Sequence, residues 1–130
     1  MTQNNPLASV LSRIQNAERV GQRQIATHIN SKVVRAVLDI LKTEGYITNY
    51  VVTKDAKGDT LTIDLGGRVN KLGVVTPRFN VKQDGFVTFE KRYLPAKDFG
   101  VLILTTTKGI ITHKQAKEAS LGGKLIAYAY

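Results

Sequence analysis

The sequence predicts an α+β protein whose chain divides near its middle. Apolar residues recur at helical spacing in the first third, and β-branched stretches follow. Gly66-Gly67 then separates two halves that differ in charge. With 130 residues, 42% of them apolar and 22% charged, the chain has the size and composition of a globular domain. This composition excludes a disordered chain, and no stretch approaches the roughly 20 apolar residues of a membrane span.

The first helix is predicted to begin at Pro6, with Asn5 as its cap, because proline is well tolerated at the first helical position. Gly21 is a plausible stop signal, and Gln24 to Ile29 is typical of a short strand. The apolar residues of the helix recur at spacings of three and four and form one stripe: Leu7, Val10, Leu11, Ile14 and Ala17.

A second helix is predicted from Lys32 to about Glu44, with Asn30 or Ser31 as its cap. Its apolar residues cover more than one stripe, so we expect this helix to be largely buried. Two strands follow as an antiparallel hairpin, Tyr46 to Thr53 and a stretch that alternates at Leu61, Ile63 and Leu65. The first half is therefore predicted to have the order α-β-α-β-β.

The second half is predicted to be mainly β, with short helices. Val101 to Leu104 is a continuous apolar run typical of a buried strand, and Leu125 to Tyr130 alternates as a final strand. Phe86 to Tyr93 fits a short helix better than a strand, and Thr112 can cap another helix from His113 to Ala119. Two shorter β-rich stretches lie on either side of Pro77: Val74 to Thr76 and Phe79 to Val81.

The charge is strongly positive and unevenly placed. There are 19 Lys and Arg against 10 Asp and Glu, which gives a net charge of +9. Residues 1–65 carry 8 basic and 6 acidic side chains, whereas residues 66–130 carry 11 basic and 4 acidic ones. A basic half of this kind indicates a polyanionic partner such as nucleic acid, although a charge surplus that serves only solubility is the alternative.

The residues give little support for catalysis or metal binding. There is no cysteine, which excludes disulfides and thiolate zinc sites and fits a cytoplasmic protein. His28 and His113 stand in no recognisable nucleophile or metal motif, and we interpret both as structural. The glycine pairs Gly66-Gly67 and Gly122-Gly123 match no phosphate-binding motif. We interpret them as bends, with close approach of the backbone to RNA as the alternative. We therefore expect no enzyme activity, no cofactor and no metal.

The segment Thr105-Thr106-Thr107-Lys108-Gly109 is predicted to be a loop that follows a buried strand. Threonine hydroxyls can donate to or accept from ribose and base edges, a lysine can neutralise a phosphate, and a glycine lets the backbone come close. The alternative is that threonines favour the end of a strand and that Gly109 favours a turn. The residue pattern leaves both interpretations open.

Two further surfaces are candidates for RNA contact. The stretch from Arg68 to Lys82 places Lys71, Arg78 and Lys82 among apolar residues, so alternation can bring several cations to one face of a strand. Ser9, Arg13 and Asn16 form a polar stripe on the first helix. For both surfaces the alternative is an ordinary solvated face.

Taken together, these motifs resemble small-subunit ribosomal protein eight in its archaeal and eukaryotic branch. The resemblance covers essentially the whole chain in register. It includes the helix from Leu7 to Ala17, the pair Ser31-Lys32, the stretch from Gly67 to Lys82, and the end from Leu121 to Tyr130. Its most specific motif is the family's Ser-Thr-Ser-Lys-Gly loop, which falls on Thr105 to Gly109 with threonine in place of both serines.

The resemblance implies two small lobes packed together, residues 1–66 and 67–130, and a structural role in the cytoplasmic small ribosomal subunit. It implies direct binding to the central domain of small-subunit ribosomal RNA early in assembly, with neighbouring small-subunit proteins as further partners. The second lobe would grip an irregular RNA helix, while the first helix and the Ser31-Lys32 turn would touch a neighbouring junction. The implied RNA-binding residues are Ser9, Arg13, Asn16, Ser31, Lys32, Lys71, Arg78, Lys82, Thr105, Thr106, Thr107, Lys108, Gly109, Gly122 and Gly123.

Two other functions are the alternatives to this interpretation. The first is a DNA-binding regulator, which no recognisable helix-turn-helix, zinc finger or heptad pattern supports. The second is a small hydrolase acting on nucleic acid or phosphate, which lacks a recognisable acid-base or metal constellation. Repression of the protein's own messenger RNA, known in some bacterial family members, stays open here.

Overall fold

The computed structural model describes residues 6–29, 31–56, 58–75, 80–82, 85–95 and 99–130. The chain divides into two compact units, residues 1–72 and 73–130, which we call the first and second lobes. Helices and antiparallel sheets occur together, which confirms the predicted α+β class. The residues between Gly66 and Leu72 fall in the first lobe, because side chains of its first helix bind their backbone, as described below.

Both helices of the first lobe are amphipathic. Helix α1 (Pro6–Arg19) buries the whole predicted stripe from Leu7 to Ala17. Helix α2 (Lys32–Thr43) was expected to be largely buried, which is wrong. Val33 is 38% exposed and Ile40 is only half-buried, because these residues lie on one flank while Val34, Val37, Leu38 and Leu41 face the core.

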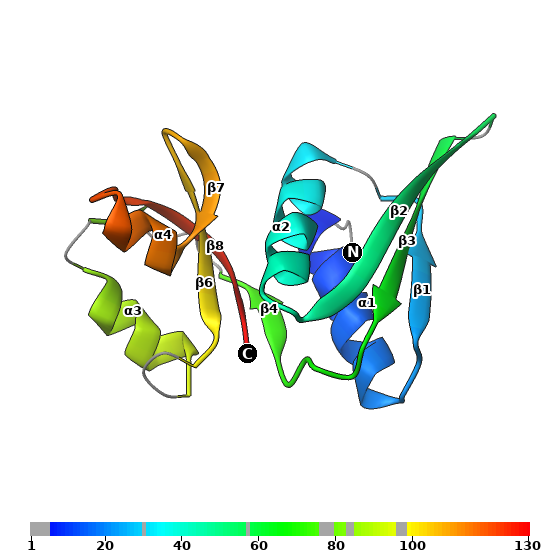
Figure 1. Ribbon diagram of the computed structural model, residues 1–130, viewed down its shortest axis with the longest axis horizontal. Coiled ribbons are helices and arrows are strands. Elements are labelled where there is room, and N and C mark those ends of the chain that lie inside the picture. Colours follow the sequence, from blue (N-terminus) through cyan, green and yellow to red (C-terminus); the bar gives the residue numbers. More distant parts are fainter. Residues whose placement is uncertain (1–5, 30, 57, 76–79, 83–84, 96–98) are drawn as a thin grey trace, which may run out of the picture. The chain divides into compact units, whose positions relative to one another are not determined.

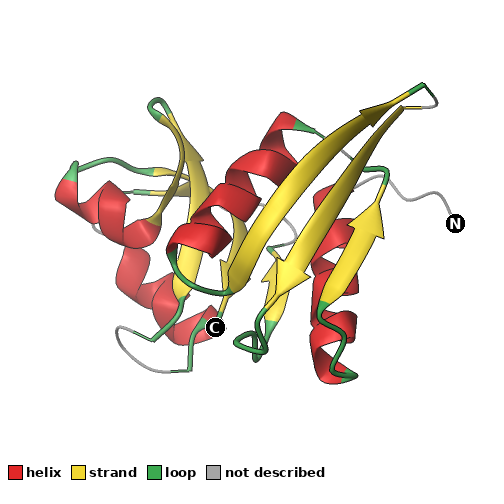
Figure 2. Ribbon diagram, turned by 45° about the vertical axis from the view of Figure 1, so that its right-hand side comes forward, coloured by secondary structure: helices red, strands yellow, loops and turns green. Residues whose placement is uncertain are grey.

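A three-stranded antiparallel sheet in the order β1-β3-β2 lies against these helices (Figure 2). Its strands are β1 (Gln24–Thr27), β2 (Ile47–Asp55) and β3 (Gly58–Leu65). The alternation predicted in β3 is confirmed, since Leu61, Ile63 and Leu65 are buried. Strand β1 ends at Thr27, two residues earlier than predicted, where the Thr27 hydroxyl accepts the backbone N–H of Ile29 and turns the chain.

The second lobe is built on a sheet in the order β4-β8-β6-β7, with β5 also paired to β8 (Figure 1). The strands are β4 (Leu72–Val74), β5 (Asn80–Val81), β6 (Val101–Thr106), β7 (Gly109–Thr112) and β8 (Gly123–Ala129). Helices α3 (Phe86–Tyr93) and α4 (His113–Glu118) confirm both predicted short helices, and Thr112 caps α4 in a capping box with Gln115. The core contains Val75, Val81, Phe86, Leu94, Leu102, Leu104, Ala116 and Leu125.

Two strand predictions in this lobe were wrong. The segment Thr105–Gly109 is not a loop, because β6 continues through Thr106 and β7 begins at Gly109 after a two-residue turn. Strand β8 does not alternate, because Leu125, Ile126 and Ala127 are all buried. Its pairing with β6 shifts register at this point: Leu125 lies opposite Leu104 and Ala127 opposite Ile103, which leaves Ile126 as an extra residue in a bulge. The predicted residues 76–79, including Arg78, lie outside the described part of the chain.

Candidate nucleic-acid interface

An open groove of about 540 Å³ on the second lobe brings together segments that are distant in sequence. One wall is β5 with the residue after it, the second is the end of β6, and the third is the turn that enters β8. Six of the predicted site residues line it, together with Asn80, Val81 and Lys124: Lys82, Thr105, Thr106, Thr107, Gly122 and Gly123. The groove is therefore the strongest candidate interface in the described part of the second lobe.

Lys124 lies in the middle of this groove, although the sequence analysis missed it. It pairs with Asn80 on one side and with Thr105 on the other. Side chains at directly opposed positions of antiparallel strands lie on the same face of the sheet. An amide, an ammonium group and a hydroxyl therefore stand in one row across three strands. The only sequence signal for Lys124 was its place directly after the predicted Gly122-Gly123 pair.

Gly123 allows the groove to form, because β8 passes very close to β6 at this residue. A methyl group on Gly123 would stand 2.3 Å from the carbonyl oxygen of Thr105 and 2.9 Å from the Thr106 Cγ2 atom. A side chain at this position would push the strands apart and separate Lys124 from Thr105. The structure thus gives Gly123 a packing role in addition to its position on the groove wall.

The β6–β7 hairpin carries the rest of the threonine-rich motif. The Thr106 hydroxyl donates to the carbonyl oxygen of Gly109 at 2.9 Å and accepts the backbone N–H of Lys108 at 3.1 Å. Gly109 has a φ of +104°, which a residue with a side chain rarely adopts. Thr107 and Lys108 are exposed at the tip. Within the described residues no hydrogen bond engages the hydroxyls of Thr105 or Thr107, whereas the Thr106 hydroxyl holds the turn.

The other predicted residues that the structure describes, apart from Lys108 and Gly109, lie on the first lobe. Ser9, Arg13 and Asn16 share one edge of α1, where Arg13 and Asn16 line a hollow of about 290 Å³. The Ser31 hydroxyl accepts the backbone N–H of Val34 at 3.2 Å, so it caps α2, and Lys32 beside it is exposed. Lys71 is exposed in the segment after β3.

His113 is built into the core of the second lobe and is only 2% exposed. Its Nδ1 atom accepts the backbone N–H of Leu102 at 3.0 Å, and its Nε2 atom lies 3.1 Å from the Glu90 carboxylate. Burial lowers the pKa of the His113 imidazole below its ordinary value, and the Glu90 carboxylate opposes this shift only in part. The neutral ring therefore accepts at Nδ1 and donates from Nε2, which ties α3, α4 and β6 together.

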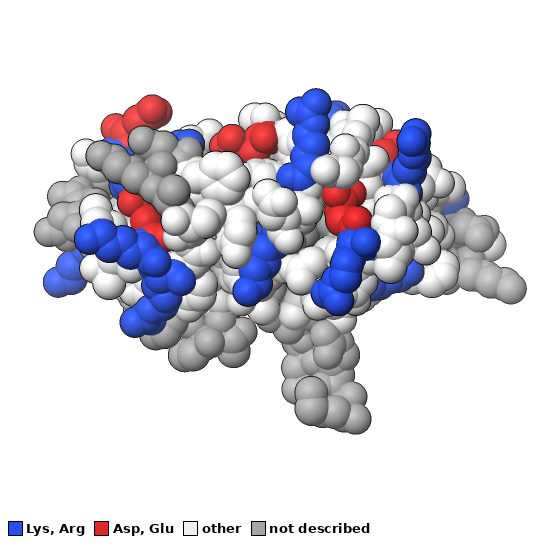
Figure 3. All heavy atoms as spheres, turned by 90° about the horizontal axis from the view of Figure 1, so that it is seen from below, with Lys and Arg blue, Asp and Glu red and all other residues white. Residues whose placement is uncertain are grey.

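On the face drawn in Figure 3, some Lys and Arg side chains lie close together and others stand alone, and Asp and Glu side chains lie near some of them. Among the described residues no group of His, Asp or Glu could hold a metal ion, and none of the described helices is long and apolar enough to cross a membrane.

A comparison with known protein families identifies the family of the chain. The sequence profile of the family described as ribosomal protein S8 matches residues 5–130, which is nearly the whole chain. Members of this family bind ribosomal RNA and other ribosomal proteins in the small subunit, and their role is structural. The chain therefore belongs to the ribosomal protein S8 family and is an RNA-binding protein of the small ribosomal subunit.

Proposed function

We propose that the protein binds the central domain of small-subunit ribosomal RNA directly and helps this domain to assemble in the cytoplasm. The observation that carries the proposal is the groove on the second lobe, which gathers Lys82, the three threonines and Lys124 from three separate segments. Net charge points to the same lobe, because residues 66–130 carry 11 of the 19 basic side chains against 4 acidic ones.

Lysines and threonines of the groove and of the adjacent hairpin contribute to RNA binding in different ways. Lys82, Lys108 and Lys124 neutralise phosphates, which supplies affinity without reading the sequence. The hydroxyls of Thr105 and Thr107 meet ribose hydroxyls or base edges, where a group that both donates and accepts suits the 2′-OH. Thr105 and Lys124 stand on paired strands, and the Thr106 hydrogen bonds hold the turn of Thr107 and Lys108, so little conformational entropy is lost when RNA binds.

The wide and shallow minor groove of an A-form helix suits a projecting hairpin tip. The turn at Thr107 and Lys108 presents an exposed hydroxyl beside an exposed ammonium group, and Thr106 keeps the two in place. This arrangement favours recognition of RNA shape over readout of bases in a deep major groove. The role is structural, and it fits the position of His113, whose two ring nitrogens are occupied inside the core.

The test is a binding titration of the full chain against a transcript of the central domain, with a 5′-domain transcript of equal length and a DNA duplex as competitors. The parent should prefer the central domain clearly over both competitors. Lys124→Ala should weaken central-domain binding by roughly tenfold, a typical loss for a hydrogen bond to a charged group. Lys114→Ala, which removes an exposed lysine of α4 from the same lobe but outside the groove, is the matched control.

Equal binding of all three nucleic acids would contradict the proposed specificity. Equal losses from Lys124→Ala and Lys114→Ala would mean that the groove is not the interface and that only net charge matters. A preference for duplex DNA would favour the regulator that the sequence left as an alternative.

A further inference from the structure

Two side chains of α1 bind the backbone of the segment that follows β3. Glu18 accepts the backbone N–H of Gly67 with Oε1 and that of Val69 with Oε2, both at 3.3 Å. Gln15, one helical turn earlier, accepts the N–H of Leu72 at 2.8 Å. We call these three hydrogen bonds the α1 clasp. They fix both ends of residues 67–72, a stretch without helix or strand structure before Leu72.

The clasp determines which side chains of the segment face outward. The Leu72 side chain is buried, and the Nη1 atom of Arg68 lies where it would be 3.7 Å from a methyl group on Gly45, just beyond the end of α2. The carbonyl groups at a helix C-terminus favour a cation, which explains this position of Arg68. Asn70 and Lys71 are exposed. Arg68 is exposed as well, and Asn70 and Lys71 stand on a stretch whose backbone is held on both sides of them.

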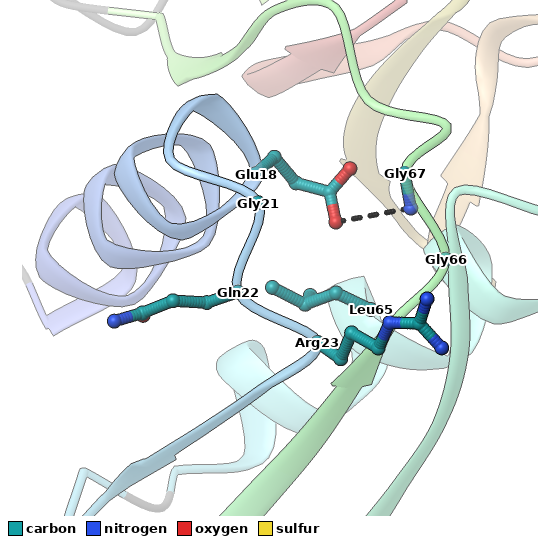
Figure 4. Close-up of a pocket in the computed structure, with 7 residues that line it drawn as sticks. All are labelled: Glu18, Gly21, Gln22, Arg23, Leu65, Gly66 and Gly67. Atoms are coloured by element: carbon teal, nitrogen blue, oxygen red, sulfur yellow. Dashed lines mark hydrogen bonds between the residues drawn. The ribbon is translucent and has the colours of Figure 1, made fainter.

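Glu18 does not present its charge to a ligand. Figure 4 shows its carboxylate directed at Gly67, beside a hollow of about 330 Å³ that Arg23 and Gly66 also line. Residues 6–23 and 66–72 contain five cations, and Glu18 is their only acid: Arg13, Arg19, Arg23, Arg68 and Lys71. Both oxygens of the Glu18 carboxylate accept backbone N–H groups, and five cations against one acid give these two segments a positive net charge.

We propose that Gln15 and Glu18 are positioning residues for a second RNA contact, made by Lys71 and Asn70 of the first lobe to the phosphates and riboses of the same ribosomal RNA. The inference rests on the proposed function, because it assumes that the RNA bound by the groove also reaches the first lobe. An ammonium group matches a phosphate, and an amide side chain can donate to a phosphate or to a ribose oxygen. Both groups stand on a backbone that is ordered before RNA arrives, which lowers the entropy lost on binding.

Removal of the Glu18 carboxylate should change RNA affinity in the direction opposite to the one that net charge alone predicts. Removal of the Glu18 carboxylate makes the protein more positive, and electrostatics alone would then strengthen its binding to RNA. If Glu18 instead holds the segment, its loss releases Gly67 and Val69, and Lys71 no longer makes its phosphate contact in the complex. Affinity should then fall although the net charge rises.

The experiment titrates variants of the full chain against the central-domain transcript at two salt concentrations. Glu18→Ala and Glu18→Gln remove the same charge, but glutamine keeps one acceptor oxygen. We expect the parent to bind most tightly, Glu18→Gln next, and Glu18→Ala about three- to tenfold more weakly than the parent. Lys71→Ala should cost a similar factor, and the double variant Glu18→Ala with Lys71→Ala should lose less than the two single losses combined, because both substitutions remove the same Lys71 contact.

The control is Glu44→Gln, which removes an exposed carboxylate at the end of α2 and should leave binding equal or slightly tighter. The slope of log affinity against log salt should fall by about 0.7–0.9, the value for one phosphate contact, in both Glu18→Ala and Lys71→Ala. A role of Glu18 in stability alone would leave the slope unchanged at temperatures where the variant is folded. Circular dichroism melts define that range.

Glu18→Ala binding at least as tightly as the parent would overturn the inference, and so would additive losses in the double variant. If Glu18→Ala melts below the assay temperature, the inference is decided instead by the order of RNA affinity among Gln15→Ala, Glu18→Gln and the parent. The two proposals fail separately. Loss of affinity in Lys124→Ala without any loss in Glu18→Ala would leave the proposed function intact, whereas a parent without preference for the central domain would refute the proposed function itself.

Discussion

Substitution of Gly123 tests whether the close approach of β8 to β6 builds the groove. A methyl group at this position would stand 2.3 Å from the Thr105 carbonyl oxygen and 3.1 Å from the Leu104 Cδ1 atom. An ordinary carbon–oxygen contact needs roughly 1 Å more, and the oxygen belongs to the backbone of a central strand, so the strands must separate. Overpacking of this kind costs about 1–3 kcal/mol. For a lobe of this size, that corresponds to a decrease in melting temperature of roughly 4–24 °C.

Gly123→Ala should therefore melt well below the parent in a circular dichroism scan, and below the melt its RNA affinity should fall because Lys124 and Thr105 move apart. The matched control is Gly85→Ala in the same lobe. A methyl group on Gly85 meets no atom closer than 3.5 Å, and its φ of −100° suits any residue. That variant should stay within about 1 kcal/mol of the parent. If Gly123→Ala melts and binds RNA like Gly85→Ala, the strands have room for a side chain and the argument from close approach is wrong.

Four further outcomes are expected. Thr107→Ala should lose about 1–3 kcal/mol of binding free energy on central-domain RNA only, because an RNA group buried in the interface is left without its hydroxyl partner. Lys108→Ala should instead weaken specific and nonspecific binding alike and lower the slope of log affinity against log salt by about 0.7–0.9. Burial lowers the pKa of His113 below 6.5, so at this site the folded chain binds fewer protons than the unfolded chain. The urea midpoint of the protein should therefore fall as the pH drops from 7 to 5.5. His113→Gln should flatten this pH dependence. Ser31→Ala removes the cap of α2 and should cost about 1 kcal/mol in the same urea titration, whereas a loss confined to RNA binding would contradict the capping role.

Elements with strong periodicity or clear end signals could be predicted from the sequence. The stripe of α1 and the alternation of β3 each depend on residues within one element, and the fold preserves both. The alternation expected in β8 failed because burial there depends on its partners. Strand β8 lies between β4 and β6 and carries a bulge opposite Ile103 and Leu104, which a pattern of single residues cannot show. Strand β7 was missed because Thr105 to Gly109 is typical of a loop. In the structure this segment forms the end of β6, a two-residue turn and the first residue of β7.

The candidate site was predictable where residues stand together in a motif, and not where the sheet assembles them. Thr105 to Gly109 and Gly122-Gly123 were found as separate short motifs, yet only the register of β6 and β8 places them on one groove. Lys124 lies 19 positions after Thr105, and its pairing with that residue depends on the strand register that changes at the Ile126 bulge. The clasp was equally hidden, because Glu18 and Val69 are 51 residues apart and the contact is to backbone.

The hairpin has threonine rather than serine at positions 105 and 107, and this choice affects its rigidity. A β-branched side chain has fewer rotamers and favours a strand, so Thr105 and Thr107 stiffen the end of β6 and the turn that follows it. Thr106 already uses its hydroxyl to hold that turn. A stiff hairpin adapts less to different RNA surfaces but loses less entropy on the one that it fits. Thr107→Ser, which keeps the hydroxyl and loses the stiffening methyl group, should therefore bind central-domain RNA nearly as well as the parent while it tolerates mismatched helices better. A tighter and equally selective serine variant would show that rigidity at this tip does not contribute to recognition.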